Sequence, residues 1–230
     1  GLVGSEMCIR DRYVPYVALA IVLFLTYRTL RSLVSDAMSR RSSVDKRSLK
    51  SLPKSLWLYV ASVFVNTMGL IHVTLMLYKA YDYFDLWLIP MFYLVVQLVD
   101  AVAAPLAGWI YDKIGRRVLL LPYALSVLPS VLALAGGAEA LIVAFVLYGI
   151  VLGMQESVYR ATVADLAPLE HRGLAYGLFD SAYGFGFMVS GVVFGFVMSS
   201  MALTAGKAYS IALEAIALTL LSLSLIRGKP

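Results

Sequence analysis

The sequence GWIYDKIGRR, residues 108–117, joins two long apolar stretches and is the most informative segment for predicting the fold. The stretches on either side, residues 86–111 and 118–135, are each long enough for a helix that crosses a lipid bilayer. Within the loop, Gly115 permits a tight reversal, and the arginines that follow it offer planar donors to carboxylates. We therefore expect a charged turn between two antiparallel membrane helices.

The composition is that of a membrane protein. Hydrophobic residues make up 61% of the 230 residues and charged residues 14%, whereas soluble domains have about 45–50% and about 25%. This excludes a soluble enzyme, a disordered segment and a nucleic-acid-binding module, although the net charge is +5. One cysteine, Cys8, and two distant histidines, His72 and His171, predict no disulfide framework, no metal site and no cofactor.

Seven apolar stretches have roughly the length of a membrane span, and only helices satisfy the backbone in spans of this kind. The sequence therefore predicts an all-α membrane protein with seven transmembrane helices. Residues 1–12 resemble translated adaptor sequence, and we expect them to be non-native. The seven predicted spans are residues 13–30, 56–79, 86–111, 118–135, 140–160, 173–199 and 208–226.

Basic residues lie mostly on one side of this arrangement. With the polar linker inside, the inner loops hold fifteen lysines and arginines, and the outer loops hold only Lys79 and Lys207. Basic residues concentrate on the cytoplasmic side of membrane proteins. We expect an integral, multi-pass protein of the plasma (inner) membrane with a cytoplasmic carboxyl terminus.

The GxxxDxxGRR pattern of residues 108–117 resembles the signature loop of the major facilitator superfamily, which follows the second helix of each six-helix half. The loop RATVADLAPLEHRGLAYGLFDSAYGFGF, residues 160–187, resembles the junction of that family's tenth and eleventh helices. The resemblance implies three parts: the last helix of an amino-terminal bundle (13–34), a cytoplasmic linker (35–55) and a complete carboxyl-terminal half (56–230).

The resemblance also implies a function. It predicts secondary active transport of a small solute by alternating access, with protons as a further expected partner. The other expected partners are the lipid bilayer and the missing amino-terminal half, and no nucleic acid is expected.

Polar residues within the apolar spans are candidates for the substrate or proton pathway, because a charge in the bilayer tends to face a cavity or a partner. Asp100 is predicted near the midplane, on one stripe with Gln97. Asp180 interrupts a glycine stripe that predicts close helix contact, made of Gly173, Gly177, Gly184, Gly191 and Gly195. The full set of pathway candidates is Asn66, His72, Gln97, Asp100, Asp180 and Tyr183.

A second set is predicted to form a cytoplasmic gate. Glu156 and Arg160 are four residues apart, so a helix would place them on one face where they can pair. Asp112 is predicted to cap the end of its span. The gate candidates are Gly108, Asp112, Gly115, Arg116, Arg117, Glu156 and Arg160.

Two other classes are the alternatives. Seven spans also fit a membrane sensor or receptor, although the retinal class needs a lysine deep in the last span and Lys207 lies only at its start. An intramembrane enzyme would need paired glutamates, and Gln155 stands beside Glu156 where the second is required, so we expect no enzyme. Glu214, in the last span, receives no functional interpretation from the sequence.

Overall fold

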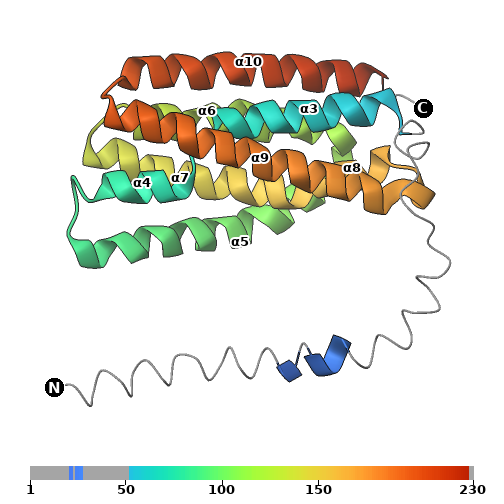
Figure 1. Ribbon diagram of the computed structural model, residues 1–230, viewed down its shortest axis with the longest axis horizontal. Coiled ribbons are helices and arrows are strands. Elements are labelled where there is room, and N and C mark those ends of the chain that lie inside the picture. The colour runs from blue at the N-terminus through green and yellow to red at the C-terminus, as the bar shows by residue number, and fades with distance from the viewer. Residues whose placement is uncertain (1–20, 23, 28–51, 228–230) are drawn as a thin grey trace. The chain divides into compact units, whose positions relative to one another are not determined.

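The computed structural model of the protein describes residues 21–22, 24–27 and 52–227 (Figure 1). Its contacts divide the chain into two units, Gly1–Ser48 and Leu49–Pro230, and each is described by itself. In the first unit the described residues are helical and exposed, and the Thr26 hydroxyl donates a hydrogen bond to the Val22 carbonyl over 2.7 Å. The first predicted span, residues 13–30, lies mostly outside the described residues.

The second unit is a bundle of helices. Short 3₁₀ turns occur at Leu86–Leu88, Gly115–Leu119 and Leu169–His171, and Gln155–Tyr159 form a π-helical turn between α7 and α8. The helices are α3 (Lys54–Gly69), α4 (Val73–Ala80), α5 (Ile89–Ile114), α6 (Leu120–Ala133), α7 (Ala138–Met154), α8 (Arg160–Leu166), α9 (Arg172–Ser199) and α10 (Leu203–Arg227).

Five helical segments are long and apolar enough to cross a membrane: Lys54–Ala80, Leu86–Ala133, Ala138–Leu166, Leu169–Ser199 and Leu203–Arg227. This establishes an all-helical, multi-pass membrane architecture over the described residues, but not the predicted count of seven spans.

The 48-residue segment Leu86–Ala133 reverses direction. Gly115 ends α5 with φ 66° and ψ −153°, a conformation that favours glycine. Contacts of Gly149 with Val96 and of Gly153 with Asp100 show that α5 and α7 run parallel. Because α6 joins these two helices, it runs back between them, and the segment contains two antiparallel helices.

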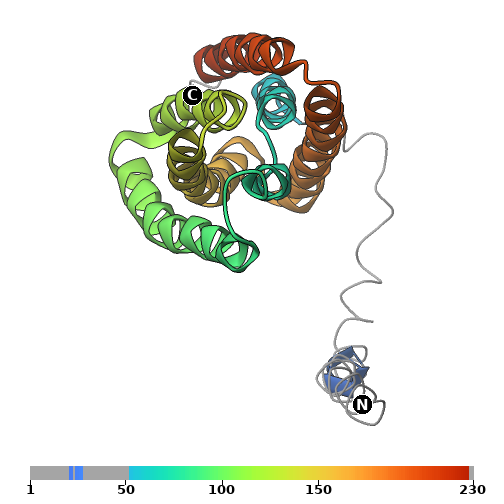
Figure 2. The ribbon, with the colours of Figure 1, turned by 90° about the vertical axis from the view of Figure 1, so that its left-hand side faces the viewer.

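Helix α3 lies within the bundle. It packs against α10 and α9, whereas α5 packs against α7, and α6 contacts both α7 and α10. Viewed end on, α10 and α5 lie on opposite outer sides of the bundle (Figure 2). Helices α3 and α10 are antiparallel. Ser224, late in α10, bonds to Ser55 at the start of α3, whereas Ser210, early in α10, bonds to Gly69 at the end of α3.

The apolar core consists of two clusters, one towards each end of the helices. Along α3, Val63 belongs to one cluster and Leu70 to the other, and Asn66 lies between them. Ser126 holds the corresponding position between Tyr123 and Ala133 on α6. A polar layer therefore crosses the bundle between the two apolar clusters.

The second predicted span is interrupted after Gly69, and Leu70 and His72 have extended backbone conformations. Hydroxyl groups from three neighbouring helices satisfy the backbone at this break. Ser130 accepts a hydrogen bond from the Ile71 N–H over 2.8 Å, Ser210 donates to the Gly69 carbonyl over 2.7 Å, and Ser190 donates to the Leu70 carbonyl. Such partners make a broken helix tolerable at membrane depth.

The glycine stripe of α9 does not make the close contacts that the sequence predicted. A Cβ atom at Gly173, Gly177, Gly184, Gly191 or Gly195 would meet nothing within 4 Å among the described residues. The close approach is instead at Gly186, outside the stripe, where a Cβ would lie 2.9 Å from the Phe64 carbonyl oxygen. The stripe lies along an edge of α9 that faces away from α3, so the predicted contact is not made among the described residues.

Candidate functional site

The half-buried Tyr183 on α9 lies at the centre of a polar surface. Its hydroxyl donates a hydrogen bond to Gln155 Oε1 over 3.1 Å. The charges of Glu156, Arg160 and Asp100 are all within electrostatic range of this hydroxyl. Residues from α5, the π-turn, α8 and α9 therefore meet at one face of the bundle.

Arg160 pairs with Asp180, not with Glu156. The Arg160 Nη2 and Asp180 Oδ1 atoms are 3.9 Å apart, and about half of each side chain is exposed. The predicted Glu156–Arg160 ion pair is not formed among the described residues, where Arg160 pairs instead with Asp180 of the neighbouring helix α9.

A groove next to this surface begins at the break between α3 and α4. His72 caps α4, and its Nδ1 lies 2.8 Å from the Thr74 hydroxyl oxygen. The groove has a volume of about 510 Å³ and lies between α4 and α9. Its lining residues are His72, Thr74, Leu75, Gly184, Phe187, Met188, Gly191 and Val192.

The His72 ring contacts Phe187 edge to face at 5.4 Å between ring centroids, and Phe187 contacts Tyr183 in the same way at 4.9 Å. The groove and the polar surface are therefore joined by aromatic side chains of α9. Polar groups beside aromatic rings are a combination that can orient a small solute.

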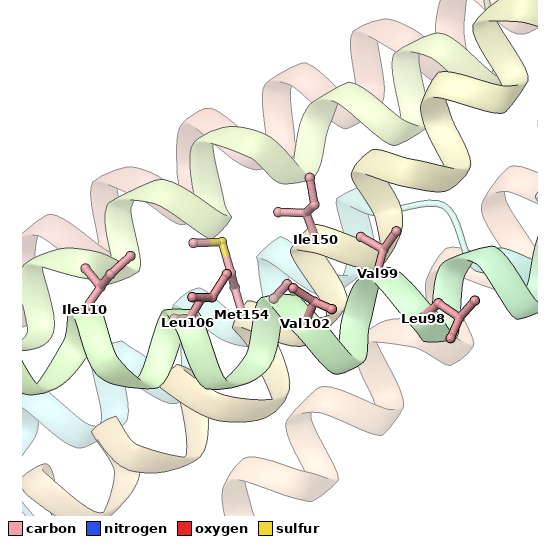
Figure 3. Close-up of a pocket in the computed structure, with 9 residues that line it drawn as sticks. Leu98, Val99, Val102, Leu106, Ile110, Ile150 and Met154 are labelled. Carbon is pink, nitrogen blue, oxygen red and sulfur yellow. The ribbon is translucent and has the colours of Figure 1, made fainter.

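A second hollow, between α5 and α7, is apolar. Figure 3 shows Leu106, Val102 and Met154 beside it, and its other lining residues are also apolar. It offers no polar side chain to orient a solute. In a bilayer it would suit an acyl chain or another apolar surface.

The two candidates on α5 differ in environment. Gln97 is exposed, whereas Asp100 is half-buried and its Oδ1 atom is buried without a hydrogen-bond partner among the described residues. Asp100 is fourteen residues from the end of α5 at Ile114, a distance of about 21 Å along the axis. It therefore lies well within the span.

Asn66 lies inside the bundle, not on an open cavity wall. It has no exposed surface. Its Nδ2 donates hydrogen bonds of 2.8 Å to Ser126 Oγ and to Glu214 Oε2, and its Oδ1 accepts from Gln155 and Tyr159. The sequence made Asn66 a candidate for the substrate or proton pathway, but α3 is enclosed by its neighbours along this face.

The loop of residues 108–117 has the predicted reversal at Gly115 but not the predicted cap. Asp112 is exposed within the last turn of α5, and Gly115 is the residue that ends the helix. Lys113 lies over the Trp109 ring at 3.4 Å from its centroid.

The helices near this loop are tied together by other residues. Tyr111 donates a hydrogen bond of 2.6 Å to Asp165 Oδ2 and so joins α5 to α8. At Gly108, a Cβ would lie 3.0 Å from the Ser157 hydroxyl oxygen. Arg116 is half-buried and Arg117 is exposed, both in the 3₁₀ turn after Gly115.

Most of the buried polar layer was not predicted from the sequence. The signal was present: Tyr59, Ser62 and Asn66 recur at helical spacing in an otherwise apolar span. The same is true of Tyr123, Ser126 and Ser130 on α6, and of Gln155, Tyr159 and Thr162 in the π-turn and α8. Within the described residues, no group of three or more His, Cys, Asp or Glu side chains is placed to hold a metal ion.

Comparisons with known proteins agree with this architecture. The sequence profile of the Major Facilitator Superfamily matches residues 13–191 and 87–228. An isoprimeverose transporter of Lactiplantibacillus pentosus is 26% identical over 208 residues, which cover 83% of this chain and 43% of that protein. Uncharacterized proteins of Mycobacterium bovis and Mycobacterium tuberculosis are 28% identical over 136 residues, covering 58% of this chain and 33% of each relative.

The chain thus spans less than half the length of these curated relatives. The profile nevertheless matches most of the chain, and the helical, multi-pass fold is of the kind that the match implies. The chain belongs to the Major Facilitator Superfamily, a family of membrane transporters.

Proposed function

We propose that this chain is the carboxyl-terminal half of a secondary active transporter that moves a small solute by alternating access. One observation carries the proposal: a polar surface lies exposed along membrane-spanning helices, beside a broken helix. Discontinuous helices near the midplane form the binding sites of many secondary transporters.

The charges on this surface need water or another part of the protein. Asp180 is eight residues from the start of α9, about 12 Å along the axis, and lies within the span. A charged side chain at the bilayer centre costs about 2.5–3.5 kcal/mol on insertion scales. The exposed side chains of Gln97, Glu156, Arg160 and Asp180 therefore favour a water-accessible passage over contact with lipid.

We infer that the amino-terminal half of the transporter covers this face. The exposed glycine edge of α9 would let the helices of that half approach closely. The isoprimeverose transporter is more than twice as long as its match to this chain, which leaves room for such a half.

We also propose a topology and a gate. The basic residues of the described loops, among them Lys113, Arg117 and Arg172, favour a cytoplasmic position for this end of the bundle and for the carboxyl terminus. Because Asp112 and Arg117 are exposed there, they are available to contact the other half when the cytoplasmic side closes.

An uptake assay tests the function. The full-length protein in proteoliposomes is given labelled isoprimeverose and a panel of other saccharides, with and without imposed proton and sodium gradients. We expect saturable uptake of at least one solute. Failure to move any solute across the membrane, in net uptake or in exchange, would contradict the proposal.

A matched pair of variants locates the pathway. Gly184→Trp places an indole in the groove at a position with open space, so we expect it to lower uptake strongly. Leu223→Trp places the same side chain on the exposed side of α10 and should leave uptake near the wild-type level. Equal uptake by the two variants would show that the groove is not on the pathway.

A further inference from the structure

Glu214 is a carboxyl group buried in the polar layer, and neither the fold nor the proposed pathway explains it. Its side chain is 5% exposed. Oε2 lies 2.6 Å from Ser126 Oγ and 2.8 Å from Asn66 Nδ2. Oε1 is buried and has no hydrogen-bond partner among the described residues.

The neighbouring titratable groups do not compensate a negative charge. Tyr123 on α6 and Tyr159 in the π-turn are the nearest, and Tyr59 on α3 contacts the Tyr159 ring. On α9 the nearest polar group of the network is Tyr183, and on α10 itself Tyr209 lies more than one turn away. Among the described residues, the hydrogen-bond partners of Glu214 include no cation.

The hydrogen atoms around Ser126 can be counted. Its hydroxyl carries one proton, and its oxygen lies 2.7 Å from the Tyr123 carbonyl oxygen, which can only accept. It also lies 2.8 Å from the Asn66 amide nitrogen, which donates to it. If Ser126 donates to the Tyr123 carbonyl, then the hydrogen in the 2.6 Å contact with Glu214 must come from the carboxyl group.

A neutral carboxyl group gives each hydrogen bond of the cluster one donor hydrogen and leaves only the Oε1 carbonyl oxygen without a partner among the described residues. Glu214 then donates to Ser126, Ser126 donates to Tyr123, and the two Asn66 N–H groups donate to Ser126 and Glu214. An ionised carboxylate would instead leave a charged oxygen, Oε1, buried without a donor, which is far more costly than a buried neutral carbonyl oxygen.

The orientation of the Asn66 amide does not alter this result. The oxygen and nitrogen of an amide side chain are assigned from the hydrogen-bond network. If the Asn66 amide is turned over, its oxygen lies 2.8 Å from Glu214 Oε2, and two such oxygens need a proton between them. With Ser126 donating to the Tyr123 carbonyl, both orientations therefore place a proton on Glu214.

The cluster is also connected to the exposed face. Tyr183 donates to Gln155 Oε1, Gln155 donates to Asn66 Oδ1 over 3.2 Å, and Asn66 donates to Glu214. A charge that appears at Glu214 would reorient this chain of dipoles up to the polar surface. Glu214 is thus linked to the site although it lies far inside the bundle.

We propose that Glu214 is a proton-binding site: its carboxylate takes up one proton and becomes a neutral carboxylic acid in the conformation seen here. It releases that proton to water in another conformation of the cycle, in which α10, α3 and α6 admit water to the polar layer. The use of this proton to drive solute accumulation rests on the proposed transport function, but the protonation of Glu214 does not.

Infrared spectroscopy tests the protonation. The full-length protein in lipid vesicles at neutral pH should show a carboxylic acid C=O stretching band that Glu214→Gln removes and that the exposed-site control Glu139→Gln retains. Ser126→Ala, which removes the acceptor of the proton together with the hydrogen bonds of Ser126 to Asn66 and Tyr123, should shift this band. Identical wild-type and Glu214→Gln spectra, with no shift in Ser126→Ala, would overturn the proposal.

Transport assays test the coupling separately. Because glutamine mimics the neutral acid, Glu214→Gln should retain solute exchange but should no longer accumulate solute against its gradient when a proton gradient is applied. Accumulation at the wild-type level would overturn the coupling. If the wild-type protein transports nothing, the proposed function fails while the infrared result still decides whether Glu214 holds a proton.

Discussion

Individual polar side chains in this protein differ greatly in how much they can contribute to stability, because some are exposed and others are buried. The Arg160–Asp180 pair spans 3.9 Å with both side chains about half exposed. Exposed ion pairs contribute about 0–1 kcal/mol to stability. We therefore expect this pair to contribute little to stability and to matter for the charged groups that it places on the polar surface.

We predict that Asp180→Asn leaves thermal unfolding nearly unchanged, with a loss of less than about 1 kcal/mol, but lowers uptake. Wild-type uptake in this variant would remove Asp180 from the pathway. The comparison needs both measurements on the same preparation of full-length protein.

Tyr111 should behave in the opposite way. Its 2.6 Å hydrogen bond to Asp165 joins α5 to α8, and hydrogen bonds to charged groups contribute about 1.5–3 kcal/mol. Tyr111→Phe should therefore lower the unfolding temperature. Tyr78→Phe, at an exposed tyrosine on α4, is the matched control and should not. Equal unfolding temperatures for the two variants would show that this bond does not stabilise the bundle.

Among the elements, α9 has two edges with different roles. The edge with Gly186 packs against α3, where a Cβ would come within 2.9 Å of the Phe64 carbonyl oxygen, whereas Gly184 faces open space. Gly186→Ala should destabilise the protein by about 1–3 kcal/mol, the range typical of overpacking. Gly184→Ala, two residues away on the same helix, is the control for stability. The packing of α9 would be refuted if Gly184→Ala were the more destabilising change.

The break between α3 and α4 depends on hydroxyl groups from other helices. Ser130→Ala would leave the buried Ile71 N–H without its partner, at a cost of about 1–3 kcal/mol. Ser222→Ala, whose exposed hydroxyl bonds only to its own helix, should cost much less. Thermal unfolding of the two variants tests whether Ser130 stabilises the break. Equal stability of the two variants would show that it does not.

How far the sequence predicts these elements depends on the range of the interactions. Long apolar stretches and the reversal at Gly115 are local features, so the sequence predicts them. The break after Gly69 has no proline to mark it, and its support comes from serines on three other helices. The pairing of Arg160 depends on Asp180, which the packing of another helix, α9, brings beside it.

At the scale of the whole molecule, the sequence predicts the membrane class and the family but not which face of each helix is enclosed. Asn66 was a pathway candidate and is buried, and the stripe glycines of α9, which were expected in a contact, have no neighbour within 4 Å of a Cβ position among the described residues. Both outcomes depend on which neighbouring helix covers each face, and hydropathy alone does not specify that.

The central claim is that the exposed polar face lines a passage that opens alternately to either side of the membrane. Labelling of Gly184→Cys, in a full-length background from which every other cysteine has been removed, tests it most directly. A membrane-impermeant thiol reagent is applied from each side in turn, with and without solute, and Leu98→Cys in the apolar hollow is the unlabelled control. We predict labelling from both sides, in a ratio that the transported solute changes. Labelling from one side only under all conditions, or from neither side, would contradict the account.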